Sequence, residues 1–143
     1  MLLVDTNVIS ELRRLGKGKG HASVAQWVDT VDAGDFHMSV ITLHELETGV
    51  RSKELRDPVQ GQALRTWLET QIIPGFAGRI IRIDQAVALR AAQLQVPDRR
   101  PISDAFIAAT ALVHGMTVVT RNIADFRNTG VAVINPWASA NEE

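Results

Sequence analysis

The sequence predicts an α/β fold, a three-layer α/β/α sandwich around a central, mainly parallel five-stranded sheet. Three observations support this prediction. Short strand-like runs alternate with helical patterns along the chain, an order that produces parallel βαβ units. No linker, repeat or low-complexity block divides the 143 residues, and 45% of them are hydrophobic, which suits one globular domain. We expect this single domain to span residues 2–137, with a short polar tail at 138–143.

The first half of the chain contains two predicted strands and three predicted helices. Residues 2–4 are an apolar run of strand type, and apolar side chains at helical spacing over residues 8–12 indicate a helix. Another helix lies within residues 21–33, where apolar residues recur at i, i+3, i+4 and i+7. Residues 36–40 have the pattern of a strand and residues 42–51 that of a helix.

The second half continues the alternation. Asp57-Pro58 opens a helix that Pro74-Gly75 closes. A strand is expected at residues 79–83 and an alanine-rich helix at 85–95. The helix between Pro101 and Gly115 is apolar nearly all round, so we expect it to be buried. The last two strands are predicted at residues 117–120 and 131–134.

Composition excludes several classes of protein. The chain has no cysteine and no tyrosine, which removes thiolate chemistry, disulfides, cysteine-type zinc sites and phenolic catalysis. Its longest strongly apolar run, residues 105–113, is less than half of the roughly 20 residues that a membrane span needs. Asp5 interrupts any apolar leader, so we expect a soluble, cytoplasmic protein. The net charge of −1 excludes a strongly basic domain, and a polyanion would be held by local patches or bound cations.

Three familiar catalytic motifs are incomplete. The segment Gly16–Gly20 is rich in glycine and lysine, but it follows a helix and lacks the spacing of a phosphate-binding loop. His44-Glu45 begins like a zincin helix, yet Thr48 stands where the second histidine is required. No serine has the flanking glycines of a nucleophile elbow. Serine hydrolase and zincin chemistry are therefore disfavoured.

Four carboxylates have a placement in common. Asp5 follows the first strand, and Glu45 is expected in the first turn of the helix after the second strand. Asp104 lies in the first turn of the buried helix, and Asp125 comes just after the fourth strand. In a parallel sheet, strand C-termini and the N-termini of the following helices share one edge, where ligands bind. We therefore expect all four carboxylates to converge there.

Each carboxylate also has an ordinary structural explanation. Asp5 or Asn7 would cap the first helix, and Thr42 with Glu45 would form a capping box. The two later aspartates would complement a helix dipole and fix a turn. Independent caps need not come from elements that share one crevice, so the joint pattern favours a site.

Convergence would be costly without a counter-charge. Two carboxylates ~6 Å apart repel by roughly 3 kcal/mol at an effective dielectric of ~20, so four would repel by about 15 kcal/mol. Such a cluster must be protonated, paired with cations or filled by metal. Hard oxygen ligands suit Mg²⁺ or Mn²⁺ rather than zinc. Two such ions can stabilise the attacking and leaving oxygens of a phosphodiester displacement.

Together these segments resemble the successive motifs of PIN-domain nucleases. The resemblance covers residues 2–137, and the segments 74–80 and 134–137 are similar to the VapC/FitB branch in particular. The matching segments are Asp5–Glu11, Thr42–Leu46, Ser103–Ala111 and Thr120–Phe126.

The resemblance implies a Mg²⁺- or Mn²⁺-dependent endoribonuclease, the toxin of a type II toxin–antitoxin pair. It also implies a homodimer and a hetero-oligomer with a VapB/FitA-type antitoxin that covers the crevice. Asp5, Glu45, Asp104 and Asp125 match the family's acidic positions, with Asp5 and Asp104 as the direct metal ligands. The polar neighbours expected to orient carboxylates, metal waters or phosphate are Thr6, Asn7, Ser103, Thr120 and Asn122.

Basic residues flank three of the acidic positions and suit an RNA backbone, although a solvated, balanced surface would explain each of them singly. The candidates are Arg13, Arg14, Arg99, Arg100 and Arg121. Two other functions remain open at this point. One is a non-cleaving PIN scaffold that binds RNA or an antitoxin. The other is a phosphatase with Asp5 as nucleophile, although Asn7 stands where that motif has its second aspartate.

Overall fold

A five-stranded parallel sheet forms the centre of the computed structural model, which describes residues 1–138; the remainder of the expected polar tail lies outside the described residues. The strands are β1 (Leu2–Val4), β2 (Phe36–Ser39), β3 (Ile80–Ile81), β4 (Thr117–Val119) and β5 (Val133–Ile134). Their spatial order is β3-β2-β1-β4-β5. β1 is central, with Leu3 paired to His37 of β2 on one side and to Val118 of β4 on the other. The predicted parallel sheet is confirmed.

Helices occupy the segments where the sequence predicts them. The α-helices are α1 (Thr6–Gly16), α2 (Ala22–Val28), α3 (Val40–Arg56), α4 (Pro58–Trp67), α5 (Ile73–Gly75), α6 (Gln85–Gln93) and α7 (Ile102–His114). The π-helical segment η2 (Leu68–Ile72) joins α4 to α5, and the 3-10 turns are η1 (Ala33–Asp35) and η3 (Ile123–Phe126). Among the described residues, no helix has the length and apolar character needed to cross a membrane.

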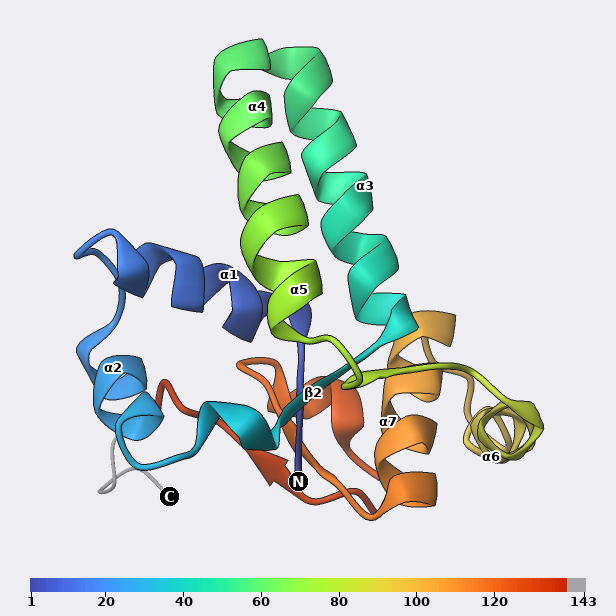
Figure 1. Cartoon of the computed structure of the whole chain (residues 1–143). Helices are drawn as coiled ribbons and strands as arrows, with labels where there is room; N and C mark the ends of the chain where they lie inside the picture. The colour runs from blue at the N-terminus through green and yellow to red at the C-terminus, as the bar shows by residue number, and fades with distance from the viewer. Residues whose placement is uncertain (139–143) are drawn as a thin grey trace.

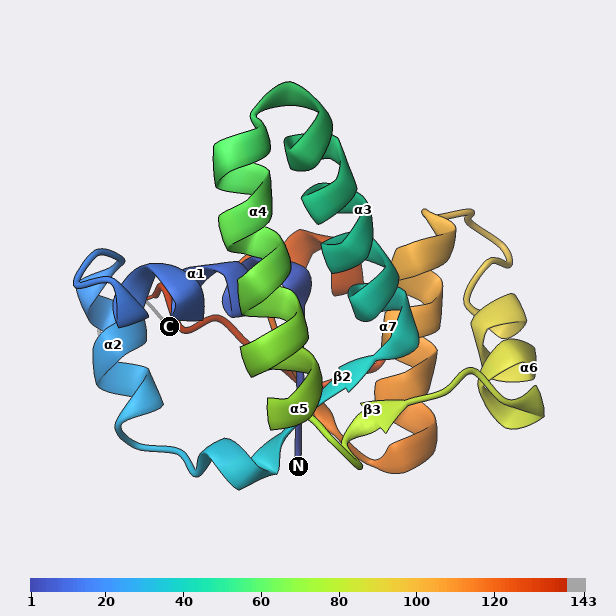
Figure 2. The same cartoon turned by 45° about the horizontal axis from the view of Figure 1, so that its top comes forward.

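The helices cover both faces of the sheet, as the predicted sandwich requires (Figures 1 and 2). Successive strand side chains point to opposite faces. Leu3 and Val118 accordingly pack with α7, whereas Val4 and Val119 pack with α1 and α3. Helix α6 lies against the outer side of α7, where Val87 contributes to a third small core. Helix α7 is thus buried from two sides, in agreement with its apolar sequence.

Helix α3 begins earlier than the sequence suggests. Ser39 caps it, because the Ser39 hydroxyl accepts a 3.0 Å hydrogen bond from the N–H of Ile41. The capping box expected at Thr42 and Glu45 is therefore wrong. Thr42 is buried, and its hydroxyl has no partner among residues 1–138. Glu45 lies in the second turn of the helix rather than the first, so its carboxylate is free to act outside its own helix end.

Helices α3 and α4 form an antiparallel hairpin that projects beyond the sheet (Figures 1 and 2). Asp57 ends the first helix and caps the second. The two backbones approach closely at Gly61, where a Cβ atom would lie 2.4 Å from Cα of Glu54. Arg65 then donates hydrogen bonds of 2.6 and 2.9 Å to Glu47 and of 2.8 and 3.2 Å to Glu54. The hairpin therefore depends on both close packing and charge pairing.

Candidate functional site

Asp5 is held at the C-terminal end of the central strand. Its backbone N–H donates to the carbonyl of Val119, which keeps it in register with β4. Its Oδ1 caps α1 by accepting a 2.8 Å bond from the N–H of Thr6. Its Oδ2 accepts a 2.9 Å bond from the hydroxyl of Thr120 and a longer one, 3.5 Å, from the amide of Asn7. Asp5 therefore caps α1, as expected, and also lies at the end of the central strand where the site was predicted.

Thr120 and Asn7 connect the ends of the two central strands. Thr120 is fully buried, and its hydroxyl accepts bonds from the Asn7 amide at 3.3 Å and from the Asn122 N–H at 3.0 Å. The carbonyl of the Asn7 side chain accepts from the Arg121 N–H at 3.1 Å. One hydrogen-bond network around Asp5 thus includes four of the five predicted polar neighbours, Thr6, Asn7, Thr120 and Asn122, but not Ser103.

Glu45 reaches the same region from α3. Its Oε1 accepts a 3.2 Å hydrogen bond from the hydroxyl of Thr6, one residue after Asp5. Burial raises the pKa of Glu45; the Thr6 hydrogen bond opposes this, and the charge of Asp5 raises the pKa further. The two carboxylates are thus near neighbours despite their distance in sequence.

Asp104 brings the four acids together. It lies half-buried in the first turn of α7. Burial and then the charges of Asp125, Asp5 and Glu45 raise its pKa to about 6, against a weaker opposing effect of Arg100. Asp125 itself is exposed in the 3-10 turn η3 that follows β4. Asp125, Asp5 and Glu45 are thus near enough to Asp104 for their charges to affect its pKa.

The donor set suits a hard divalent cation that keeps part of its water shell. Within residues 1–138, no three His, Asp or Glu side chains are close enough to hold one ion between them. Mg²⁺ does not require such a cage, because proteins usually bind it through one or two carboxylates and leave several waters in place. Ser103, beside Asp104, makes no side-chain hydrogen bond within the described residues and could contact a water or phosphate.

The predicted basic residues do not form one continuous track. Arg14 and Arg121 line a common pocket of about 470 Å³. Arg100 is half-buried and donates to the carbonyls of Leu94 and Arg127, so part of its guanidinium is used within the fold. Arg99, the next residue back along the chain, is exposed.

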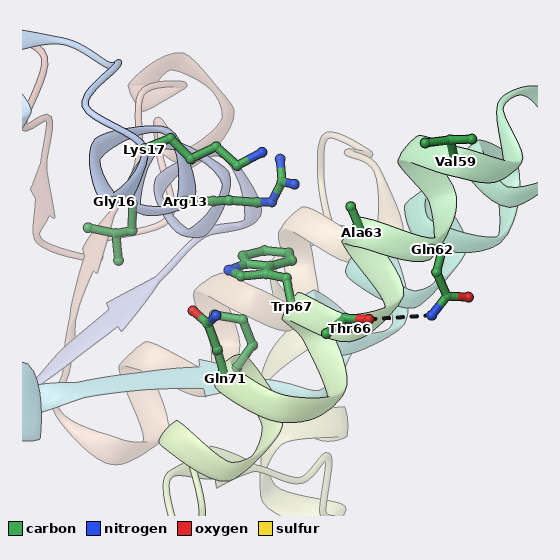
Figure 3. Close-up of a pocket in the computed structure, with 11 residues that line it drawn as sticks. Arg13, Gly16, Lys17, Val59, Gln62, Ala63, Thr66, Trp67 and Gln71 are labelled. Atoms are coloured by element: carbon green, nitrogen blue, oxygen red, sulfur yellow. Dashed lines mark hydrogen bonds between the residues drawn. The ribbon is translucent and has the colours of Figure 1, made fainter.

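Arg13 occupies a different cleft, between α1 and α4 (Figure 3). Its guanidinium lies 5.7 Å from the ring centroid of Trp67. This cleft of about 790 Å³ contains none of the four acids. This cleft is therefore separate from the four acids, and Arg13 does not line the pocket that Arg14 and Arg121 share.

Two residues beside the acids were not singled out as candidates from the sequence. Glu11 is only 8% exposed and Trp137 is half-buried, and both line the pocket with Arg14 and Arg121. Glu11 could have been found from its position four residues after Asn7, because this spacing places both side chains on one face of α1. Trp137 gave no comparable local signal, because only the tertiary fold brings it to α1.

Comparisons with known proteins agree with this architecture. The sequence matches the PIN domain family over residues 2–131. Toxin FitB of Neisseria gonorrhoeae is 39% identical over 142 residues, which cover 96% of this chain and 99% of that protein. VapC ribonuclease Y4jK of Sinorhizobium fredii is 32% identical over 145 residues, which cover 98% of this chain and 100% of the relative.

Solved structures extend the similarity to three dimensions. A crystal structure of FitAcB from Neisseria gonorrhoeae matches with a TM-score of 0.86 and 38% identity, over 97% of this chain and 100% of that chain. A toxin–antitoxin complex from Klebsiella pneumoniae matches with a TM-score of 0.67 and 27% identity, over 97% of this chain and 100% of that chain. The family match over residues 2–131, the two relatives and the similar crystal structure show that this chain belongs to the PIN domain family.

Proposed function

We propose that this chain is a Mg²⁺- or Mn²⁺-dependent endoribonuclease that acts as the toxin of a VapBC-type toxin–antitoxin pair. The observation that carries the proposal is the environment of Asp104. Burial raises its pKa first, and carboxylates from three other segments of the chain then raise it to about 6. A divalent cation bound at these carboxylates would relieve this repulsion. The names of two relatives, a toxin and a ribonuclease, support the same proposal.

We assign direct metal binding to Asp5 and Asp104. Thr6, Asn7 and Thr120 hold the carboxylate of Asp5 in one orientation through hydrogen bonds to both of its oxygens. Such supporting contacts fix the geometry of metal ligands. When bound, the divalent ion supplies the Lewis acidity that activates water and stabilises charge on the phosphodiester.

Glu45 and Asp125 complete the acidic set in this proposal. Thr6 holds Oε1 of Glu45, whereas Oε2 makes no hydrogen bond within the described residues. We assign Glu45 to orient the attacking water and to accept its proton at Oε2. Asp125, which is exposed, acts through an intervening water. Ser103 and Asn122 lie beside the acids and contribute polar contacts to the phosphate.

The remaining parts of the proposal concern partners. The exposed residues Arg14, Arg99 and Arg121 are assigned to bind the RNA backbone. Arg100, whose guanidinium bonds within the fold, attracts the backbone by its charge. Arg13 lies beside Trp67 and contacts only an RNA strand long enough to reach α4. We assign an antitoxin as the partner, in keeping with the similar structure of a toxin–antitoxin complex. We also assign a homodimer whose acidic crevice the antitoxin covers. The active unit is one PIN domain, residues 2–137, that works in the cytoplasm, where RNA is available.

Digestion of a defined RNA pool tests the proposal. The wild type is incubated with Mn²⁺ or with excess chelator, and the ends of the products are mapped. Asp5→Asn is the inactive variant, and Asp29→Asn is the matched control, because Asp29 is exposed and its side chain makes no hydrogen bond within the described residues. We expect cleavage only with metal, and only in the wild type and the control. Binding of RNA without cleavage would instead support the non-cleaving scaffold, and cleavage by Asp5→Asn would refute the mechanism.

A further inference from the structure

A second pocket lies along α1 and is connected to Asp5 through Arg121 and Asn7. It measures about 470 Å³, which is sufficient for one nucleobase, and its lining residues are Glu11, Arg14, Gly20, His21, Arg121 and Trp137. Asn7, Glu11 and Arg14 follow one another on one side of α1, because residues three and four apart are neighbours on a helix. This stripe of α1 extends from the hydrogen-bond network of Asp5 into the pocket.

Glu11 is a largely buried glutamate whose side chain lines this pocket. It is only 8% exposed. Its Oε1 accepts a 3.1 Å bond from the backbone N–H of His21 and lies 3.4 Å from Nε of Arg14. The hydrogen bond and the closest approach of Arg14 are both at Oε1 and not at Oε2. Oε2 is not one of the buried side-chain atoms that lack a partner among the described residues, and Glu11 lines the pocket, so Oε2 can accept a hydrogen bond from water or from a ligand donor there.

Arg121 and Trp137 form the opposite wall. The guanidinium of Arg121 lies 5.4 Å from the ring centroid of Trp137. Single-stranded RNA bases stack on aromatic rings and on arginine planes. The backbone N–H of Arg121 also donates to Asn7, which in turn contacts Asp5. The stacking wall is therefore fixed to the same network that orients the proposed metal ligand.

We propose that this pocket binds the base of a nucleotide next to the scissile bond, and that Glu11 selects guanine there. The inference rests on the proposed ribonuclease function. A carboxylate only accepts hydrogen bonds. Guanine presents two adjacent donors, its N1–H and its amino group, without an acceptor between them. The single N–H of uracil is flanked by carbonyls, which Oε2 would repel.

The charges at the pocket favour RNA over a segment of a protein partner. An arginine or lysine of a partner would also pair with Glu11, but Arg14 and Arg121 at the pocket would repel its charge. The same two arginines attract the phosphates that accompany a nucleotide. A nucleotide thus matches the whole pocket, because its base can donate to Glu11 and its phosphate can pair with the two arginines. A cationic side chain would match Glu11 alone.

Glu11→Gln tests base selection. The side-chain carbonyl of the variant still accepts from the His21 N–H, so its amide nitrogen faces the pocket as a donor. Cleavage of an RNA pool randomised on both sides of the cut should show a guanine preference of about tenfold for the wild type. This preference, measured as the ratio of cuts beside guanine to cuts beside the other bases, should be lost in Glu11→Gln and should persist in the control Asp29→Asn. An unchanged guanine preference in Glu11→Gln would overturn the inference and leave the proposed function intact.

A binding experiment separates the two proposals. Asp5→Asn is titrated with short single-stranded RNAs that contain either guanosine or only uridine, with fluorescence anisotropy as the readout. We expect about tenfold tighter binding of the guanosine oligonucleotide, and loss of that difference when Glu11→Gln or Trp137→Leu is added. Equal affinity for both oligonucleotides in Asp5→Asn would contradict the inference even if the wild type cleaves no RNA. Thermal unfolding of each variant shows that it is folded.

Discussion

The hydroxyl of Thr120 donates a 2.9 Å hydrogen bond to Oδ2 of Asp5, across 115 residues of chain. Thr120 is fully buried at the end of β4, directly beside the end of β1. The contact exists because the parallel sheet places both strand ends at one edge. Asp5 is thereby fixed by a residue that does not itself belong to the acidic set.

Replacement of Thr120 by valine should weaken metal-dependent cleavage by about tenfold to a hundredfold, the usual effect of removing a contact that orients a metal ligand. It should also lower the free energy of unfolding by about 1–3 kcal/mol, because the Asn7 amide and the Asn122 N–H lose their acceptor. Thr120→Ser keeps the hydroxyl and should restore most of the cleavage. If Thr120→Val cleaved as well as Thr120→Ser, the hydrogen bond to Asp5 would have no functional role.

Asp104→Asn should stabilise the metal-free chain at neutral pH but not in acid. The pKa of Asp104 is about 6 in the folded chain, against an ordinary value of 3.8. Between these values the folded state binds more protons than the unfolded state, so the free energy of unfolding falls as pH rises. The gain of the variant should be absent below about pH 4 and reach about 1–2 kcal/mol above pH 6. This is less than the full shift implies, because the carboxyl is partly solvated.

Urea unfolding in the presence of chelator, at several pH values between 4 and 7, measures this difference. Asp29→Asn serves as the control, since it removes an exposed carboxylate outside the acidic set. A stability difference between Asp104→Asn and wild type that does not change with pH would show that Asp104 carries no electrostatic strain.

Addition of Mn²⁺ or Mg²⁺ should raise the melting temperature of the wild type. A ligand that binds only the folded state at one hundred times its Kd stabilises it by about 2.7 kcal/mol. Asp5→Asn and Asp104→Asn remove the assigned ligands, so both should lose most of the metal-dependent shift, whereas Asp29→Asn should keep it. Differential scanning fluorimetry with and without metal gives the comparison. Equal metal-dependent shifts in all four proteins would place the ion elsewhere.

Much of the fold could be predicted because local patterns and global topology agree. The run of apolar residues 105–113 indicated a buried helix, and α7 is enclosed between the sheet and α6. Gly115 was expected to end that helix, and it adopts the left-handed conformation with φ of 67° that glycine tolerates best. The apolar run at residues 2–4 likewise predicted β1, and it therefore placed Asp5 correctly at the C-terminal end of that strand.

Contacts between distant segments were harder to predict. Thr42 and Glu45 have the spacing of a capping box, but the hydroxyl of Ser39 caps the helix one turn earlier. Arg100 was a candidate contact to the RNA backbone, and its guanidinium donates to the carbonyl groups of Leu94 and Arg127 within the fold. Glu11 lies within the motif that begins at Asp5, but only the folded chain encloses its carboxylate. Sequence spacing thus predicted which elements carry the acids. It could not predict the hydrogen bonds that support them, because those bonds join distant segments of the chain.

The hairpin of α3 and α4 offers a test that is independent of catalysis. Arg65 is only 18% exposed and bonds both Glu47 and Glu54, whereas Arg51 is 75% exposed and bonds Glu47 alone. Arg65→Ala leaves two facing carboxylates without their shared partner, so we expect the melting temperature to fall by roughly 5 °C. Arg51→Ala, the matched control, should lower it by about 1 °C or less, as is usual for an exposed pair.

The effect of Arg65→Ala should also depend on pH in a defined direction. Arg65 lowers the pKa of Glu47 from its ordinary value of 4.5, and it lowers the pKa of Glu54 as well. The stabilisation is therefore complete above about pH 4.5 and is lost as the pH falls through the lowered values. Melting curves at pH 7 and pH 3 should show a large difference between Arg65→Ala and wild type at the first pH and a small one at the second. Equal differences at both would mean that Arg65 supports the hairpin by packing alone, because protonation of the two glutamates would then not matter.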